Sequence, residues 1–309
     1  MNGGSITMMG TVTRREFSWT LAAGLGAASW NGASAQGNAR RQKIGHTGIT
    51  WGFAPKDAEQ AIKDVASLGY YGYESFGNVL ESWEATGGLN VLLDAQHLPL
   101  RSAYCPLNLT DTTKRTDEVA KLVRWAKLIK KCGGSVAVLG PNSVPRATYD
   151  FAAHKTDIVA ALNDMGKALD GTGVIGALHQ HTGTCIESRD ETYAVMEAVD
   201  TRYVKFGPDV GQLQKGGSDP VKVVKDFQSV VHHVHLKDFD GGPDFLGYCP
   251  LGRGKVNVPA IVDLLETSGH DVMIMVELDP SEGRPMAIAP VETARISKQY
   301  LQTLGYTFR

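Results

Sequence analysis

Short apolar segments alternate with longer segments of helical periodicity from Lys43 to the C-terminus. Residues 116–131, for example, carry apolar side chains such as Leu122 and Ala126 at intervals of three or four, which predicts a helix. The segments predicted to be strands are 44–51, 70–76, 98–107, 135–139, 174–181, 203–210, 230–236 and 272–278. The helical segments that follow them are 57–69, a looser stretch up to 97, 116–131, 150–169, 189–198, 220–227, 259–267 and 291–304.

This alternation predicts an α/β protein. Strands that are separated by helices must pair in parallel through right-handed crossovers. The closed arrangement of eight such units is the (β/α)8 TIM barrel, with active residues at the carboxyl ends of its strands. A doubly wound open sheet is the alternative, but no G-x-G-x-x-G follows the first strand. We therefore predict a single TIM-barrel catalytic domain over residues 43–309.

The first 35 residues have the pattern of an export signal. The pair Arg14-Arg15 precedes an apolar stretch over 19–30, and small residues end at Ala35. Adjacent arginines before Phe17 resemble the twin-arginine signal, whereas the alternative is a frayed terminus with an accidental Arg pair. We predict cleavage near Ala35, a linker over 36–42 and a periplasmic mature protein. No other stretch has 18 or more apolar residues, so we expect no membrane span in the mature form.

Composition narrows the possible partners. The chain has 31 Lys+Arg against 33 Asp+Glu, a formal net charge of −2, so it lacks the basic excess of a nucleic-acid binder. An apolar content of 42% is enough to build a core. The four cysteines form no C-x-x-C pair and predict neither a zinc knuckle nor a particular disulfide. The outer helices of a barrel can support a homo-oligomer, but the sequence does not define its size.

Polar side chains gather at the ends of the predicted strands, where a barrel carries its chemistry. Because strand residues alternate between faces, His179 and His181 point the same way, and so do His233, His235 and Lys237. Imidazole and carboxylate groups from several strands can then meet in the lumen, as ligands of Zn, Mn, Fe or Co. The strand-end sequences are Tyr73-Glu74-Ser75, His179-Gln180-His181, Asp209-Val210-Gly211-Gln212, His233-Val234-His235-Leu236-Lys237 and Val276-Glu277.

Each of these residues also has a structural interpretation. Asp209 before Gly211 could shape a turn, and His235 could be a hydrogen-bonded core histidine. Glu277 ends an apolar run, where an unpaired carboxylate would be costly, so it needs a cation or a metal ion. The coincidence across four strand ends favours the metal site.

The order and spacing of these motifs resemble the xylose-isomerase-like TIM-barrel superfamily. Its members include sugar phosphate isomerases/epimerases and inosose dehydratases, and the inosose dehydratase pattern is the most similar. The motifs are His179-x-His181-Thr182-Gly183, Asp209-x-Gly211, His233-x-His235-Leu236-Lys237-Asp238, Leu251-Gly252-x-Gly254 and Val276-Glu277-x-Asp279. The resemblance implies one divalent ion (Mn favoured over Co, Zn, Fe or Mg). Its ligands would be His179, Asp209, His235 and Glu277.

Two positions depart from that family. Ketose epimerases carry Glu at the position of His179, so a two-glutamate epimerisation is not expected here. The usual histidine after Asp-x-Gly is Gln212, which can only donate or accept hydrogen bonds. We therefore expect dehydration or β-elimination slightly ahead of isomerisation or epimerisation. The multi-zinc endonucleases of the superfamily need more histidines than these strand ends supply.

The residue types suggest a mechanism on a keto-sugar or keto-polyol, by α-proton abstraction through a metal-bound enediolate. His181 or Glu277 is the candidate base, since a histidine titrates near neutrality. Glu74 and Lys237 are candidate acids or substrate contacts, with surface salt bridges as the alternative. The candidate substrate-contacting residues are Trp51, Gln212, His233 and Arg253. Two other functions stay open, a metal-dependent glycoside hydrolase and a non-catalytic periplasmic sugar-binding protein.

Overall fold

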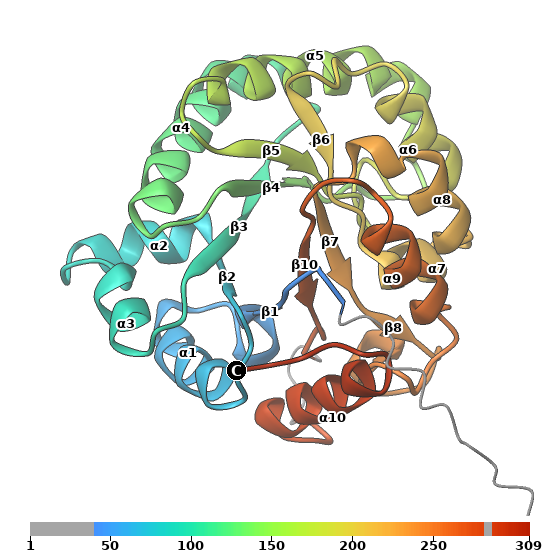
Figure 1. Ribbon diagram of the computed structural model, residues 1–309. Coiled ribbons are helices and arrows are strands. Elements are labelled where there is room, and N and C mark those ends of the chain that lie inside the picture. The colour runs from blue at the N-terminus through green and yellow to red at the C-terminus, as the bar shows by residue number, and fades with distance from the viewer. Residues whose placement is uncertain (1–39, 281–285) are drawn as a thin grey trace, which may run out of the picture. The chain divides into compact units, whose positions relative to one another are not determined.

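Eight parallel strands form one sheet in the order β6-β5-β4-β3-β2-β1-β10-β7 (Figure 1). The protein is described by a computed structural model over residues 40–280 and 286–309. The predicted export signal lies outside these residues. The strands are β1 Ile44–Thr47, β2 Tyr73–Phe76, β3 Leu100–Leu107, β4 Val136–Pro141, β5 Ile175–Leu178, β6 Val204–Phe206, β7 His233–Leu236 and β10 Met273–Val276.

The outer strands β6 and β7 come together and nearly close the sheet into a barrel. Isolated parallel bridges join Phe206 to Val231 and Asp209 to His235. Backbone hydrogen bonds of 3.0 Å cross the same seam, from His235 N to the carbonyl of Pro208 and from the neighbouring His232 N to that of Phe206. The predicted single (β/α)8 barrel is confirmed.

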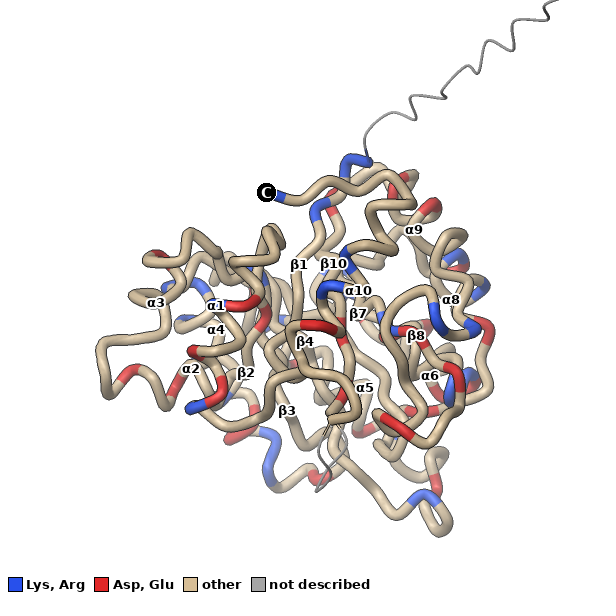
Figure 2. The backbone as a smooth tube through the Cα atoms, turned by 90° about the horizontal axis from the view of Figure 1, so that it is seen from below, with Lys and Arg blue, Asp and Glu red and all other residues tan. Residues whose placement is uncertain are grey.

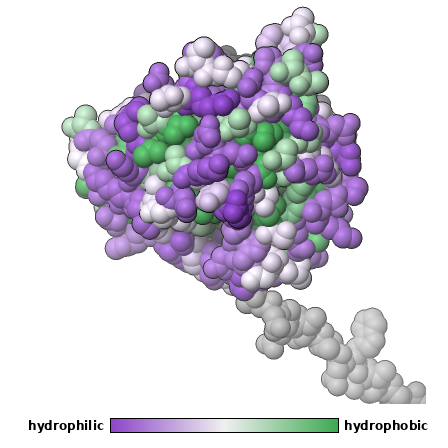
Figure 3. Space-filling model, turned by 90° about the horizontal axis from the view of Figure 1, so that it is seen from above, coloured by the Kyte–Doolittle hydropathy of each residue, from purple (hydrophilic) through white to green (hydrophobic). Residues whose placement is uncertain are grey.

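Helices surround the sheet (Figure 1). Several begin at a residue whose side chain accepts from the first-turn N–H groups, among them Asp150 before α5 and Ser188, which forms a capping box at α6. The helices are α1 Ala58–Ser67, α2 Gly77–Glu84, α3 Leu89–Ala95, α4 Arg115–Lys131, α5 Phe151–Leu169, α6 Arg189–Met196, α7 Val210–Lys215, α8 Pro220–Asp226, α9 Val258–Glu266 and α10 Pro290–Thr303. Figure 3, seen from the side of α5, shows a mostly hydrophilic face with smaller hydrophobic patches.

Three segments differ from the prediction. The first strand ends at Thr47 and continues as a 3₁₀ helix over Gly48–Trp51, where a Cβ on Gly48 would lie 2.1 Å from the Tyr73 hydroxyl. The predicted strand 203–210 is strand only over Val204–Phe206, and the unpredicted short helix α7 begins at Val210. A small antiparallel pair, β8 Asp238–Phe239 with β9 Tyr248–Cys249, follows β7. These elements are too short to show a period in the sequence.

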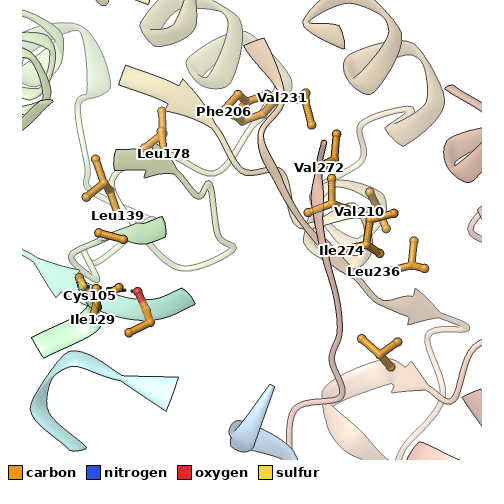
Figure 4. Packing of buried hydrophobic residues seen from close by; sticks show 14 of the residues in the cluster. Cys105, Ile129, Leu139, Leu178, Phe206, Val210, Val231, Leu236, Val272 and Ile274 are labelled. Atoms are coloured by element: carbon orange, nitrogen blue, oxygen red, sulfur yellow. Dashed lines mark hydrogen bonds between the residues drawn. The ribbon is translucent and has the colours of Figure 1, made fainter. Parts of the chain in front are cut away.

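The two faces of each barrel strand pack into different layers. In β4, Ala137 and Leu139 join the large cluster between sheet and helices, whereas Val136 and Val138 form a separate small cluster with Ala177. This is the alternation expected of a strand that is buried on both faces. Figure 4 shows part of the large cluster, including Leu139 and its neighbours on adjoining strands and on α4. The smaller cluster therefore lies on the opposite face of β4 from the large one.

Charges of both signs are spread over the outer helices and loops (Figure 2). Among the described residues, no helix combines the length and apolar character that crossing a membrane requires. All four cysteines, Cys105, Cys132, Cys185 and Cys249, carry free thiols.

Candidate metal centre and active site

The closure of the barrel places two predicted metal ligands side by side. Asp209 follows β6 and bridges to His235 on β7. The Gln180 side chain fixes Asp209 from the β5 side, because its amide donates to the Asp209 carbonyl at 2.9 Å and its oxygen accepts from the Asp209 N–H at 3.3 Å. His179 and Glu277 directly follow β5 and β10. All four predicted ligands therefore lie at the carboxyl end of the barrel.

Glu74 on β2 holds two histidines of β7 by their Nε2 atoms. Its carboxylate oxygens lie 2.7 Å from His233 Nε2 and 2.6 Å from His235 Nε2, and Ser102 Oγ donates to it at 2.5 Å. Since a carboxylate can only accept, each Nε2 carries the proton. The Nδ1 atom of each imidazole is buried and makes no hydrogen bond among the described residues, and that of His235 lies 3.0 Å from Glu277 Oε2. A carboxylate behind an imidazole is the usual support of a metal-ligating histidine.

His179, Asp209 and His235 form a buried group whose ligand atoms all lie within 4.8 Å of one another. His179 Nε2 is 4.0 Å from Asp209 Oδ2, and its Nδ1 is 3.2 Å from the Gly207 carbonyl. The two carboxylate oxygens of Asp209 have different roles. Oδ1 accepts from Gln212 N and caps α7, while Oδ2 faces the group. Glu277 borders the same group, with Oε2 3.0 Å from His235 Nδ1.

A second group of possible ligands consists of Glu74, His233 and His235. Both oxygens of Glu74 are already used by the two Nε2–H groups. This second group is therefore satisfied without an ion, which leaves the His179, Asp209 and His235 group as the better metal site.

Lys237 brings a positive charge into this cluster. Its fully buried ammonium lies 2.8 Å from Asp209 Oδ2, 2.6 Å from Glu277 Oε1 and 2.9 Å from Asp279 Oδ2. It also lies over the Tyr248 ring, 4.7 Å from the centroid. Burial alone would lower its pKa, but the charges of Asp209, Asp279 and Glu277 raise the pKa of Lys237 well above its usual value. The lysine therefore remains charged and neutralises part of the carboxylate cluster.

The remaining charges show that the site favours a further cation. Burial raises the pKa of Glu277 to about 7, although His235 and Lys237 oppose the shift. Burial would lower the pKa of His235, but the charges of Glu277 and Glu74 outweigh it and raise this pKa to about 9. Burial lowers the pKa of His179 well below its usual value, which keeps that imidazole neutral. Three buried carboxylates, those of Asp209, Glu277 and Asp279, surround Lys237, and a fourth, Glu74, faces His235. These four carboxylates share two cationic partners, Lys237 and His235, so the remaining negative charge is available to a proton or a metal ion.

His181 lies beside this group, and its protonation pattern is fixed. Gln212 Oε1 accepts from Thr182 Oγ1 at 2.6 Å, so the Gln212 amide must donate. That amide lies 2.7 Å from His181 Nε2 and 3.3 Å from Asp279 Oδ2. His181 Nδ1 in turn lies 2.7 Å from the Thr182 carbonyl. His181 is therefore held with its proton on Nδ1 and its Nε2 lone pair directed at Gln212.

A cavity of about 320 Å³ opens onto the site. Among the predicted residues, His179, His181, Glu74 and Glu277 line it. Lys237, His233, His235, Gln212 and Asp209 lie behind this lining and are almost completely buried.

Two predicted substrate-contacting residues lie away from this cavity. The Trp51 indole N–H donates to Asp64 at 2.8 Å, and its ring packs edge-on against His46. Arg253 lines a different cavity near β8 and β9. Its loop is held by the Asp238 carboxylate, which accepts from Gly252 N and Gly254 N at 3.0 and 2.9 Å. The structure brings neither side chain to the lining of the metal-site cavity.

Four residues of the site were not among the predicted set. Asp279 lies two residues after Glu277, so the alternation that grouped the histidines could have found it. Ser102 and Gln180 act through their contacts with Glu74 and Asp209, and Tyr248 enters from β9. Their positions depend on strand register and loop path, for which the sequence holds no local signal.

The donor set suits a divalent metal ion. Among the described residues, Asp209 Oδ2 and His235 Nδ1 form no hydrogen bond, and their close contacts are the ion pairs with Lys237 at 2.8 Å and with Glu277 at 3.0 Å. These two atoms belong to the same three-residue group, whose donors of imidazole and carboxylate type are those that first-row divalent ions accept. His179, Asp209, His235 and Glu277 are the residues that would hold the ion.

The fold and the site together define a TIM barrel with histidines and carboxylates converging at the carboxyl ends of its strands. Residues 62–304 match the family described as "Xylose isomerase-like TIM barrel". The chain belongs to this family, as the resemblance of its motifs implied.

Comparisons with individual proteins agree with this family. The chain is 27% identical over 270 residues to inosose dehydratase of Lacticaseibacillus casei, covering 79% of this chain and 88% of that protein. Its fold is similar to that of the apo 3-keto-D-glucoside 4-epimerase YcjR from E. coli, with a TM-score of 0.67, 16% identity and coverage of 85% and 100%. It is also similar to the IolI protein with a bound zinc atom, with a TM-score of 0.69, 16% identity and coverage of 85% and 98%.

Proposed function

We propose that this chain is a divalent-metal-dependent enzyme that removes the proton α to the carbonyl of a keto-sugar or keto-polyol. The observation that carries the proposal is the convergence of His179, Asp209 and His235, with Glu277 at their edge, on one cavity. The similarity to inosose dehydratase supports a dehydration or elimination. The epimerase of similar fold, which by its name acts on a keto-glucoside, supports a keto-sugar substrate.

The ion would stabilise the negative charge that develops on the carbonyl oxygen during proton removal. Manganese is our proposed ion, since the family resemblance favours it and carboxylate ligands suit it. His179 Nε2 and His235 Nδ1 would supply the nitrogen donors, Asp209 and Glu277 the oxygen donors. Glu74 would hold the His235 ring in the orientation that directs Nδ1 to the site.

Glu277 is the proposed base. It lines the cavity, and Lys237 and His235 fix its carboxylate at 2.6 and 3.0 Å. His181 also lines the cavity, but both its nitrogens are engaged, one by Thr182 and the other by Gln212. We therefore assign His181 to substrate contact. Lys237 stays charged and positions Glu277.

The proton that Glu277 takes can follow two routes. Returned to the former carbonyl carbon, it gives an isomer of the substrate, whereas an epimer requires that a proton reach the α-carbon from the opposite face. Returned to a β-oxygen substituent, it allows that C–O bond to break as the carbonyl re-forms and a C=C bond forms between the α- and β-carbons, which is an elimination. We expect elimination to dominate, because a second glutamate on the opposite face, where His179 stands, is absent.

Proton exchange tests this function directly. The metal-loaded protein is incubated in deuterated water with methyl 3-keto-β-glucoside and, separately, with methyl β-glucoside. We expect loss of the proton signal beside the carbonyl, or an eliminated product, with the keto-glucoside alone. Cleavage of the plain glucoside without exchange would instead indicate a hydrolase, and binding without either would indicate a sugar-binding protein.

Variants then separate the roles of Glu277 and His181. Glu277→Gln should lower the exchange rate at least about a thousandfold, whereas His181→Gln should lower it less, by about 10 to 100-fold. Glu59→Gln on α1, an exposed residue paired with Lys63, is the matched control and should keep the wild-type rate. The assignment is wrong if His181→Gln is the more damaging change.

A further inference from the structure

The lining of the cavity at the metal site contains two kinds of side chain. Some are polar, including Thr47, Ser75 and Glu74. Others are largely apolar, namely Ile49, Phe53, Phe76, Tyr104 and Pro106. A free polyol offers hydroxyl groups in every direction and would match only the polar residues.

Two hydroxyls of the polar lining residues lack partners in the part of the chain that the structure describes. Thr47 and Ser75 belong to the lining, and their hydroxyl oxygens are buried and have no hydrogen-bond partner among the described residues. A buried hydroxyl without a partner is costly, so this part of the lining favours a polar neighbour over an apolar one. The polar residues of the lining therefore suit the sugar portion of a substrate.

Three of the apolar lining residues form a ladder of aromatic rings that leads away from the metal ligands. The Tyr104 ring meets His179 edge-on with centroids 5.5 Å apart, Phe76 meets Tyr104 at 5.9 Å, and Phe53 meets Phe76 at 6.0 Å. The ladder therefore begins at a proposed ligand and ends at Phe53, which is 47% exposed.

Phe53 is exposed although its loop is well fixed. Gly52 N donates to the Ile49 carbonyl at 2.9 Å, and Ala54 N donates to the Asp57 carboxylate at 3.0 Å. The Trp83 indole N–H on α2 donates to the Pro55 carbonyl at 3.0 Å. The protein thus holds a large apolar side chain at the mouth of a polar site, where it is hydrated without a ligand.

We infer that Phe53 and Phe76 form a subsite for an aromatic aglycone, so that the substrate is an aryl glycoside of a keto-sugar. This inference rests on the proposed function. A sugar ring at the metal ligands would face Tyr104 and leave the two outer rings uncovered, whereas an attached aryl group would extend along them and gain both burial and ring–ring contact. The cavity volume of about 320 Å³ lies within the range of pockets that hold drug-sized ligands, roughly 300–1,000 Å³.

Two glycosides that differ only in the aglycone test the subsite. KM is measured for phenyl and methyl 3-keto-β-glucoside, and Kd is measured by calorimetry for the unoxidised phenyl and methyl β-glucosides. Covering one aromatic ring predicts about tenfold tighter binding of each phenyl compound by the wild-type protein. Phe53→Ala should remove most of this preference. Its binding of the phenyl compounds should weaken about tenfold, and its binding of the methyl compounds less than twofold.

The control variant is Val91→Ala on α3, which changes another exposed apolar side chain that does not line the cavity. It should keep the phenyl preference. Equal binding of phenyl and methyl compounds, or an equal loss for both in Phe53→Ala, would overturn the subsite. A stronger preference for a sugar aglycone, tested with 3-keto-cellobiose, would also overturn it.

The outcomes distinguish the subsite from the proposed function. Exchange on methyl 3-keto-β-glucoside without a phenyl preference leaves the function standing and removes the subsite. A phenyl preference in Kd that depends on Phe53, without exchange on either keto-glucoside, supports the subsite and removes the function.

Discussion

The two faces of strand β7 belong to regions with opposite chemistry. Val234 and Leu236 point outward into the apolar cluster between sheet and helices, while His233 and His235 point inward to Glu74. The outer region is held by burial of apolar surface, which needs no specific partner. The inner region buries charge, which is tolerated only where each charge has a partner.

Within this one strand, the outward-facing residues therefore contribute to the stability of the fold, and the inward-facing residues contribute to the chemistry of the site. Removing a methyl group from the outer region leaves a cavity, whereas removing one charge from the inner region leaves another charge without compensation. Substitutions in the outer region should therefore lower stability, whereas substitutions in the inner region should also change metal binding and turnover.

The largest effect is expected for Asp209→Asn. Asparagine caps a helix as well as aspartate does, so α7 should stay intact, but the site loses a carboxylate ligand. We expect loss of bound metal and at least about a thousandfold loss of turnover, since several kcal/mol of charge stabilisation disappear. Metal analysis and steady-state kinetics measure both. Asp219→Asn, which changes the exposed cap of α8, should leave both at wild-type levels. Equal behaviour of the two variants would contradict the assignment.

Lys237→Gln tests the charge balance of the inner region. Without the ammonium, the carboxylates of Asp209, Glu277 and Asp279 repel one another, and we expect the metal-free protein to lose about 3–5 kcal/mol of stability. Added divalent ion should restore more stability to this variant than to the wild type, because the ion binds the folded state. Urea unfolding with and without a chelator measures this.

The control for that experiment is Lys215→Gln. The Lys215 ammonium lies over the same Tyr248 ring as Lys237, at 4.8 Å, but it is exposed and donates to the Leu246 carbonyl. This variant should change stability by less than about 1 kcal/mol. A Lys237→Gln protein as stable as this control would show that the cluster needs no fixed cation.

Ile129→Ala tests the outer region. Ile129 on α4 is fully buried in the large cluster, so its truncation should cost about 2–5 kcal/mol (Figure 4). Metal content and turnover, measured below the unfolding temperature, should remain those of the wild type. Val91→Ala on the surface should change stability by no more than about 0.5 kcal/mol. Loss of metal from a folded Ile129→Ala protein would show that the two regions are not independent.

The sequence was sufficient for the barrel and for the inward orientation of the site residues. Both follow from periodicity, because every strand is bracketed by a helical pattern and the spacing of His233, His235 and Lys237 is that of one strand face. The contact of Asp209 with His235 depends on how β6 and β7 close the sheet, and periodicity carries no information about register.

Contacts across the barrel could not be predicted from the sequence either. Glu74 holds both histidines of β7 from a strand 159 residues earlier in the chain, and no local pattern marks such a pair. In the segment after β1, Phe53 and not Trp51 lines the cavity, because the first strand ends at Thr47 and the 3₁₀ helix that follows turns the indole toward Asp64. The position of a loop side chain depends on that turn.

The most direct test of the account is a crystal structure of the metal-loaded protein with anomalous diffraction from the ion. We predict one ion within about 2.0–2.3 Å of donor atoms from His179, Asp209, His235 and Glu277, with Glu74 still bound to His235 Nε2. An ion held instead by Glu74 and His233, or a metal-soaked crystal with no ion at these four side chains, would contradict it.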